Sequence, residues 1–246
     1  MTVMRIGNGD DLVLLHGWGM NGAIFESWAE RLKQHFCCHL VHLPGFGGSA
    51  ACDNADLDEW LDALLPKLPE QAYWLGWSLG GLLVQRLAQR HPERVSAQLL
   101  VATTPHFPAV EPWRGIKPQV LAQFVEQLSQ NPGKTIERFL AIQAMGSESA
   151  KQDIRQIKAQ LSAHPAPNDI ALQQGLALLQ QVDFRDVATQ PPQHWLLGKL
   201  DSLVPVALAE SIQGVATVLP KASHAPFISH PEESTEWLLR ATGKLD

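Results

Sequence analysis

The chain has 246 residues, of which 45% are hydrophobic and 18% are charged. This balance is typical of a globular enzyme, and the length allows one large α/β domain with an insertion. The net charge of −6 leaves no basic footprint for nucleic acid, so no nucleic-acid partner is expected. Because no apolar run reaches about 18 residues, no membrane-spanning helix and no membrane partner are expected either.

Short runs that are apolar at every position recur along the chain and end in turn residues. Such runs are typical of strands buried on both faces of a parallel sheet. The runs are Leu12–Leu15, Cys38–Leu43, Tyr73–Leu75, Leu99–Ala102, Trp195–Leu197 and Val215–Leu219. Helical patterns lie between the earlier runs, at Ile24–Gln34, Leu57–Leu65 and Leu79–Gln89. This alternation predicts a doubly wound α/β fold with a mostly parallel sheet.

The alternation of strand and helix stops after Thr104. Four helical segments follow, near residues 117–130, 133–145, 148–163 and 168–181. A helical insert between strands of such a sheet is a common way to build a lid over an active site. We therefore expect an α/β core formed by residues 1–108 and 184–246, and a four-helix lid formed by residues 109–183.

The N-terminus and the cysteines indicate where the chain works. The first residues, MTVMRIGNGDD, lack the apolar stretch of a signal peptide. The three cysteines, Cys37, Cys38 and Cys52, include an adjacent pair but no C-x-x-C pair. The pattern favours reduced thiols in the cytoplasm and predicts neither a disulfide framework nor a zinc site. No metal or organic cofactor is expected.

A serine sits between two glycines in the stretch "YWLGWSLGGLLVQRLAQR". The motif is G-x-S-x-G, with Gly76, Ser78 and Gly80 at its fixed positions, after an apolar run and before a helical pattern. A tight turn between strand and helix exposes a serine hydroxyl as a nucleophile, and glycines avoid the clashes that side chains would make there. The alternative is a structural serine that caps the helix.

A serine nucleophile needs a base and an acid, which follow it in the order Ser, Asp, His in this arrangement. "WLLGKLDSLVP" places Asp201 just past a strand end, where active-site groups of α/β sheets collect. "LPKASHAPFISHPEE" places His224 in the loop after the last strand. Asp201 could instead belong to a surface turn. His230 competes with His224, but it directly precedes a helix start, where capping or exposure explains it.

The same chemistry needs two backbone amides that bind the oxyanion. Leu79, directly after the nucleophile, supplies one. The turn at His16 and Gly17 in "LLHGWGMNG" places the Trp18 amide as the second. A simple turn at the end of a strand is the alternative reading of that stretch.

These motifs resemble the α/β-hydrolase family over nearly the whole chain. The matching segments are "HGWG", "LPGFGGS", "GWSLGG", "HPERV", "GKLDSLVP" and "SHAPFISHP". Within the family, "GIKPQVLAQF", "ERFLAIQAMG" and "HAPFISHP" are similar to the esterases of biotin synthesis that act on acyl chains held by acyl-carrier protein. One departure is His42, where many relatives carry aspartate after the second strand. We expect an altered local hydrogen bond there and no lost chemistry.

The resemblance implies a substrate and a partner. The substrate is the methyl ester of a pimeloyl chain on acyl-carrier protein, and short free esters are expected to react as well. The acyl chain is expected to run along one face of a lid helix that contains Phe139, Leu140, Ala141, Ile142 and Gln143.

Basic residues at helical spacing in the lid fit an acidic carrier. Lys134 and Arg138 lie four residues apart, as do Lys151 and Arg155, so each pair shares a helix face. The resemblance implies that these four cations contact the carrier. An ordinary solvated helix face is the alternative.

Two rival functions remain open on the sequence. One is a generalist carboxylesterase or a C–C bond hydrolase with the same triad. The other is a receptor with this fold that binds a ligand without turnover.

Overall fold

The computed structural model describes residues 3–143, 150–188 and 191–245. In this part of the chain, seven strands form one sheet in the order β1-β3-β2-β4-β5-β6-β7. They are β1 (Val3–Ile6), β2 (Asp10–Leu15), β3 (Phe36–Val41), β4 (Ala72–Trp77), β5 (Val95–Val101), β6 (Gln193–Gly198) and β7 (Val215–Leu219). Neighbouring strands run parallel, except that β1 is antiparallel to β3. The predicted doubly wound, mostly parallel sheet is confirmed.

The sequence analysis did not anticipate β1, the antiparallel edge strand. Its four residues, Val3–Ile6, pair with four residues of β3, from Val41 back to Cys38. The run is short and only partly buried. It therefore lacks the fully apolar pattern by which the inner strands were predicted.

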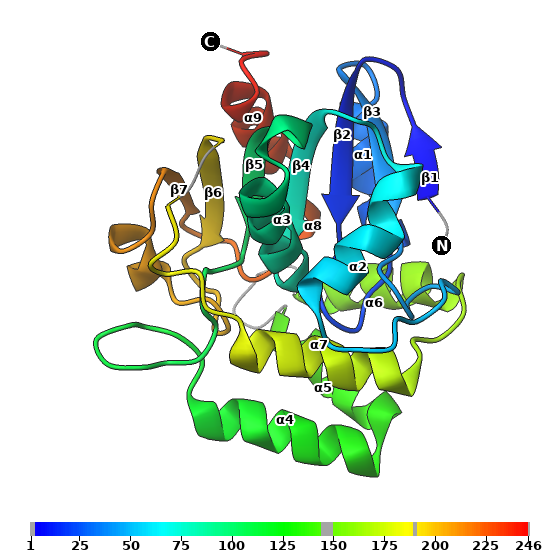
Figure 1. Cartoon of the computed structure of the whole chain (residues 1–246), viewed down its shortest axis with the longest axis vertical. Coiled ribbons are helices and arrows are strands. Elements are labelled where there is room, and N and C mark those ends of the chain that lie inside the picture. Colours follow the sequence, from blue (N-terminus) through cyan, green and yellow to red (C-terminus); the bar gives the residue numbers. More distant parts are fainter. Residues whose placement is uncertain (1–2, 144–149, 189–190, 246) are drawn as a thin grey trace.

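Helices cover both faces of the sheet. In the view of Figure 1, α2 (Leu57–Leu64) and α3 (Leu79–Arg90) lie in front of the strands, and α1 (Glu26–Leu32) and α9 (Pro231–Ala241) lie behind them. Shorter helical turns complete the connections: η1 (Gly22–Phe25), η2 (Leu65–Lys67), η3 (Pro92–Arg94), η4 (Val206–Glu210) and α8 (Pro226–Ser229).

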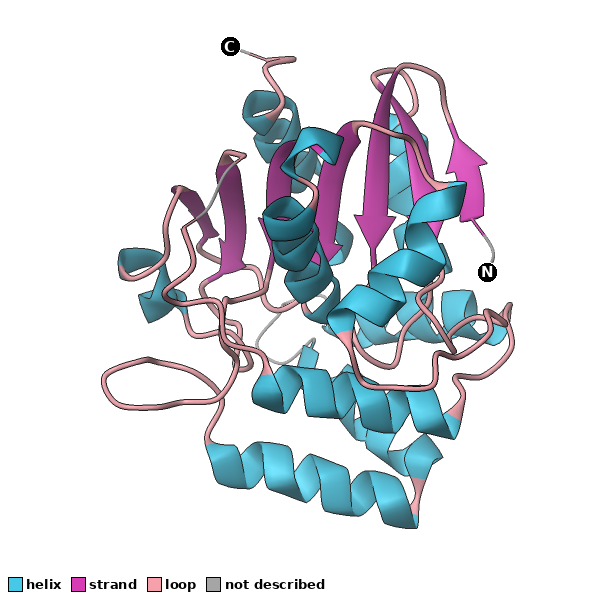
Figure 2. Ribbon diagram, in the orientation of Figure 1, coloured by secondary structure: helices cyan, strands magenta, loops and turns pink. Residues whose placement is uncertain are grey.

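Four helices lie between β5 and β6 in the described part of the chain. They are α4 (Pro118–Gln130), α5 (Pro132–Gln143), α6 (Ala150–Ser162) and α7 (Asp169–Gln181), and we call them the insert helices. Figures 1 and 2 show them gathered beyond the carboxyl ends of the parallel strands. This is the edge of an open α/β sheet at which ligands bind. Across the described residues, none of the helices is both long and apolar enough to cross a bilayer.

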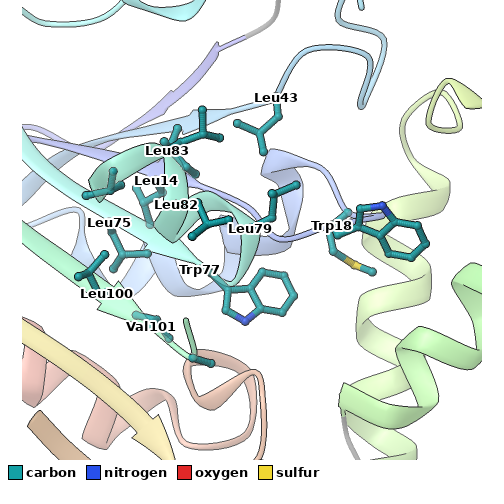
Figure 3. Close-up of a cluster of buried hydrophobic side chains, with 14 of the residues drawn as sticks. Leu14, Trp18, Leu43, Leu75, Trp77, Leu79, Leu82, Leu83, Leu100 and Val101 are labelled. Atoms are coloured by element: carbon teal, nitrogen blue, oxygen red, sulfur yellow. The ribbon is translucent and has the colours of Figure 1, made fainter. Parts of the chain in front are cut away.

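The core beneath α3 is made of leucines and tryptophans that water does not reach. Leu79, Leu82 and Leu83 of α3 face the strands, and Figure 3 shows them against Leu14 and Leu75. Each such side chain contributes about 1.5–3 kcal/mol through burial. This packing fixes the start of α3, which follows the serine directly.

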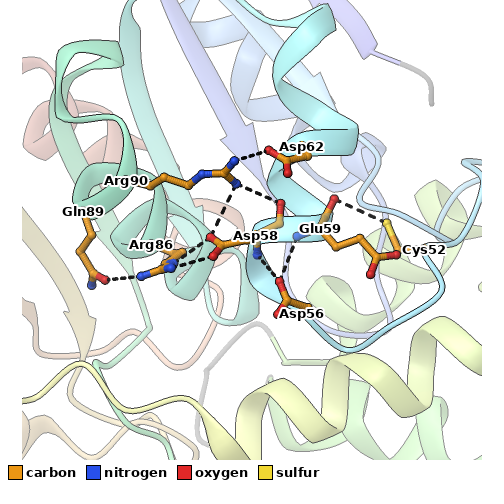
Figure 4. Close-up of polar contacts among 8 residues, drawn as sticks. All are labelled: Cys52, Asp56, Asp58, Glu59, Asp62, Arg86, Gln89 and Arg90. Atoms are coloured by element: carbon orange, nitrogen blue, oxygen red, sulfur yellow. Dashed lines mark hydrogen bonds and ion pairs between the residues drawn. The ribbon is translucent and has the colours of Figure 1, made fainter.

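Ion pairs on the outer surface tie α3 to α2 (Figure 4). Arg86 donates two hydrogen bonds to the carboxylate of Asp58, at 2.8 and 2.6 Å. One helical turn later, Arg90 pairs with Asp62 at 2.7 Å. Asp56 caps the start of α2 by accepting from the backbone amides of Asp58 and Glu59. These contacts hold the two helices in register at the solvent side.

Candidate active site

Ser78 lies on a strained turn between β4 and α3. Its backbone has φ 54° and ψ −117°, a conformation that residues with a side chain rarely adopt. The side chain is buried, and it makes no capping hydrogen bond to α3. The alternative reading of Ser78 as a helix cap therefore finds no support in the geometry.

The two glycines of the motif lie where two segments of backbone approach each other too closely for a side chain. A Cβ on Gly76 would lie 2.4 Å from the carbonyl oxygen of Gly80, and a Cβ on Gly80 would lie 2.2 Å from that of Leu15. Neither position has room for a side chain. The Thr103 hydroxyl, two residues after β5, donates to the Ser78 carbonyl oxygen at 2.7 Å and so stabilises the turn.

Asp201 and His224 form a buried hydrogen-bonded pair. His224 Nδ1 lies 2.7 Å from Asp201 Oδ2, and both side chains are 1% exposed. The other carboxylate oxygen accepts from the backbone amides of Leu203 and Val204. Since three donors surround the carboxylate, it fixes the orientation of the imidazole. The reading of Asp201 as a surface turn is not compatible with this burial.

The loop of His224 is fastened to the residue that precedes the serine. The Trp77 indole N–H donates to the His224 carbonyl oxygen at 2.7 Å. His224 Nε2, the ring nitrogen on the other side from Asp201, is buried and has no hydrogen-bond partner among the described residues. No contact in that part of the chain joins the Ser78 hydroxyl to Nε2, so the serine–histidine link stays a prediction. His230 instead contacts its neighbour Ser229 at 2.8 Å.

The predicted oxyanion loop lies directly against the serine. A Cβ on Gly17 would be 3.1 Å from the Cβ of Ser78. Among the described residues, neither the Trp18 amide nor the Leu79 amide donates a hydrogen bond to a protein acceptor. Leu79 is the first residue of α3, where helix amides are unpaired and the dipole favours negative charge.

His16 holds this loop in place, a role that the sequence analysis did not assign. The Leu43 amide donates to His16 Nε2 at 3.0 Å, so Nδ1 carries the proton and donates to the Gly17 carbonyl oxygen at 2.8 Å. Burial lowers the pKa of His16 to about 3 and keeps the ring neutral. The position of an H-G pair after the first buried strand was the only sequence signal for this role.

His42 hydrogen-bonds to the backbone near the start of η1. Its Nδ1 accepts from the Gly22 amide at 3.1 Å, at the start of η1. Burial is the main cause that lowers the pKa of His42 to about 4. The ring also packs against His164 of the loop before α7, with 4.8 Å between the ring centroids.

The insert helices contact the predicted oxyanion loop through Trp18. The Trp18 indole donates to the Leu172 carbonyl oxygen of α7 at 2.8 Å, and its ring meets Phe139 of α5 edge-on at 5.0 Å. Figure 3 shows Trp18 at the margin of the core, beside these helices. The hydrogen bond to Leu172 gave no sequence signal, because it joins residues 154 positions apart.

The predicted acyl-contacting residues differ in exposure. Phe139 and Leu140 are buried, whereas Ala141 is exposed. Ile142 and Gln143 complete α5, but their side chains lie outside the described residues.

All four predicted carrier-contacting cations are exposed. Lys134 and Arg138 lie on α5, and Lys151 and Arg155 lie on α6. Lys151 and Arg155 line a surface hollow of about 540 Å³. Arg138 also donates to Gln127 of α4 at 2.8 Å.

Comparison with known proteins agrees with this geometry. A family profile described as alpha/beta hydrolase fold matches residues 11–231. A pimeloyl-[acyl-carrier protein] methyl ester esterase from Vibrio vulnificus (strain CMCP6) is 46% identical over 245 residues, which cover 97% of this chain and 96% of the relative. An esterase of the same name from Shewanella woodyi is 49% identical, and the match covers 97% of both chains.

Solved structures show the same fold at lower identity. An esterase from Exiguobacterium antarcticum superposes with a TM-score of 0.84 at 23% identity, covering 98% of this chain and 94% of the other. A bromoperoxidase from Bacillus anthracis gives a TM-score of 0.86 at 18% identity, with the same coverage. On the profile match, the relatives and the fold, the chain belongs to the α/β-hydrolase family.

Proposed function

We propose that the chain is a serine carboxylesterase that hydrolyses the methyl ester of a pimeloyl group held on acyl-carrier protein. The observation that carries this proposal is the buried Asp201–His224 pair beside the strained turn of Ser78. The chemistry of the pair accounts for the reaction class. The substrate follows from the relatives, whose name specifies this ester.

The reaction proceeds in two acyl-transfer steps. His224 takes the Ser78 proton as the hydroxyl oxygen attacks the ester carbonyl, and Asp201 stabilises the imidazolium that forms. The amides of Trp18 and Leu79 donate to the oxyanion. The imidazolium then protonates methanol as it leaves, and water hydrolyses the acyl-enzyme by the same route. The products are methanol and the free distal carboxylate of the pimeloyl chain, a step that serves biotin synthesis.

The insert helices act as a lid that receives the acyl chain and the carrier. Phe139 packs on Trp18, next to the oxyanion amides, so the inner side of α5 borders the reacting ester. The acyl chain runs past Phe139 and Leu140. The four exposed cations on α5 and α6 face the acidic carrier, and their attraction is modest and weakened by salt because exposed ion pairs contribute about 0.2–1 kcal/mol each.

The test compares two substrates in three proteins. The substrates are the pimeloyl-carrier methyl ester and a short nitrophenyl ester. The first variant reverses the charges of Lys134, Arg138, Lys151 and Arg155 to glutamate. The matched control reverses four exposed lysines elsewhere: Lys33, Lys67, Lys199 and Lys221.

The proposal predicts a loss of kcat/KM of about 10–100-fold for the carrier-bound ester in the first variant, the combined effect of losing four weak pairs. The short ester should react as in the wild type, and the control variant should retain both activities. Equal losses on both substrates would favour a generalist esterase. Absence of turnover of either ester by the wild-type protein would favour a ligand receptor.

A further inference from the structure

Three side chains of different chemistry meet at the amino-terminal end of the sheet. In the parallel register of β2 and β3, Asp11 lies directly opposite Cys37, and His39 follows two residues later on the same face. A carboxylate oxygen of Asp11, Cys37 Sγ and a ring nitrogen of His39 all lie within 4.8 Å of one another. None of the three belongs to the proposed catalytic machinery.

Protons hold this cluster together. His39 Nε2 and Asp11 Oδ1 are 2.5 Å apart and share a hydrogen bond, and Cys37 Sγ lies within 4.8 Å of the ligand atoms of both residues. The His39 ring is 2% exposed, and its second nitrogen, Nδ1, has no partner among the described residues. A cation placed between the three groups would take over the contacts that these protons now make.

We propose that Asp11, Cys37 and His39 form a binding site for a borderline-soft divalent cation, of which Zn²⁺ is the best match. Thiolate, imidazole and carboxylate are the ligands that Zn²⁺ takes in proteins, at about 2.0–2.3 Å. Mg²⁺ and Ca²⁺ prefer oxygen ligands alone, so they should not compete. The site was not apparent from the sequence because its ligands come from two strands and follow no C-x-x-C spacing.

Small side-chain movements suffice to form the site. Tetrahedral coordination at those bond lengths sets neighbouring ligand atoms about 3.3–3.6 Å apart. His39 and Asp11 must therefore separate by about 1 Å, and Cys37 must approach by a similar amount. The Asp11 side chain is 41% exposed and can rotate without disturbing the core. Asp11 and Cys37 are both partly exposed, so the ion can reach them from solvent.

Charge and protons balance when the ion binds. Cys37 enters the site as a thiol, because an ordinary cysteine is protonated near neutral pH. Binding releases that proton to solvent, and the thiolate and the carboxylate neutralise the dication. His39 binds the ion through the lone pair of Nε2, which an imidazole offers when its ring proton is on Nδ1. Arg5, which is paired with His39 across β1 and β3, opposes the cation and makes its affinity moderate.

The proposed site lies away from the proposed catalytic groups. Asp11 and Cys37 lie near the starts of β2 and β3, whereas the proposed catalytic groups follow strand ends at the opposite edge of the sheet. A bound ion joins two neighbouring strands and stabilises the folded state by mass action.

Calorimetric titration of the metal-free, full-length protein with Zn²⁺ tests the proposal. The variants are Cys37→Ser and Asp11→Asn, and the matched control is Cys52→Ser, which removes the other partly exposed thiol. We expect one Zn²⁺ per wild-type chain and about one proton released, measured in two buffers of different ionisation enthalpy. Each variant should weaken binding by at least about tenfold, and the control should not.

A second readout separates thiolate coordination from adventitious surface binding. Co²⁺ should give a thiolate-to-metal absorption band in the near ultraviolet with the wild type and with Cys52→Ser, and no such band with Cys37→Ser. Zn²⁺ should raise the melting temperature of the same two proteins only. Both variants should hydrolyse a short ester at the wild-type rate, which would show that they fold. Failure of the wild type to bind Zn²⁺, or binding by Cys37→Ser and Asp11→Asn as tight as that of the wild type, would overturn the proposal.

Discussion

The sheet and the insert helices differ in how far their functional polar groups are exposed to solvent. At the carboxyl end of the sheet, His16, Ser78, Asp201 and His224 are buried and held by the backbone around them. On the insert helices, the cations at the predicted carrier surface are exposed, and Lys158 of α6 pairs with Glu137 of α5 in solvent. Buried groups are preorganised for chemistry, whereas exposed charges contribute through long-range attraction. We therefore expect substitutions in the sheet to change the rate of hydrolysis of every ester. Substitutions on the insert helices should instead change the preference for one substrate over another.

The largest effect is expected from Asp201→Asn. The substitution keeps the shape of the side chain but loses the charge that stabilises the imidazolium, so kcat on either ester should fall by about 10⁴-fold. Steady-state kinetics on a short nitrophenyl ester measure it. Asp186→Asn, at an exposed carboxylate, is the control and should retain full activity. A loss below tenfold for Asp201→Asn would contradict the catalytic role proposed for Asp201.

Gly175→Ala tests whether the insert also reaches the chemistry. A Cβ at Gly175 of α7 would lie 2.7 Å from Trp18 Cδ1 and 3.2 Å from Leu79 Cδ2, so it would displace both residues of the proposed oxyanion hole. We expect kcat to fall by about 10–100-fold, less than the loss of a whole oxyanion donor. The control is Gly133→Ala on α5, where a Cβ would meet only Asn131 at 3.7 Å. Equal activity in both variants would show that α7 does not position the loop.

The buried histidines of the sheet should make the fold sensitive to acid. The pKa values of His16 and His42 are lowered to about 3 and about 4, so the unfolded chain binds protons more readily than the native one below pH 6.5. Their contribution is complete above pH 6.5 and is lost as pH falls towards these values. Urea unfolding at pH 8 and pH 5 should reveal a loss of about 2 kcal/mol per histidine.

The control for the acid effect is a variant that cannot titrate at the same place. His42→Asn keeps an acceptor for the Gly22 amide, and its free energy of unfolding should lose less between the two pH values. An identical pH dependence in this variant would exclude His42 as a source of the effect.

The smallest effect is expected at the surface of the sheet domain. Arg86→Ala removes the pair of hydrogen bonds to Asp58 between α2 and α3, but both side chains are more than one third exposed. The free energy of unfolding should drop by less than about 1 kcal/mol, and less at high salt. A larger loss in thermal unfolding would mean that the ion pairs, and not the leucines beneath them, hold α3 in place.

The residues that could be predicted from the sequence are those with a local pattern. Asp201 and His224 were identifiable because each follows an apolar strand run, in the chain order that a serine nucleophile requires. The turn of Ser78 was identifiable because glycines at fixed positions on both sides of the serine indicate a tight turn between strand and helix. The sequence could not reveal contacts made only by folding, such as the Trp18 indole on Leu172 and the Leu43 amide on His16.

Strand β1 and the Asp11–Cys37–His39 cluster escaped prediction for related reasons. Strand β1 has only four residues and an exposed arginine among them, so its sequence carries a weak pattern. The three cluster residues owe their proximity to the register of β2 and β3, which periodicity alone does not fix. Local chemistry was therefore accessible from the sequence, whereas pairing between distant segments was not.

Labelling with a fluorophosphonate probe tests the central claim most directly, because such probes react only with a serine activated by its neighbours. We predict that the wild-type protein takes up one probe per chain, that peptide mass spectrometry locates it on Ser78, and that His224→Ala abolishes the reaction. Absence of labelling in the wild-type protein, labelling of a different serine, or undiminished labelling of Ser78 in His224→Ala would contradict the account.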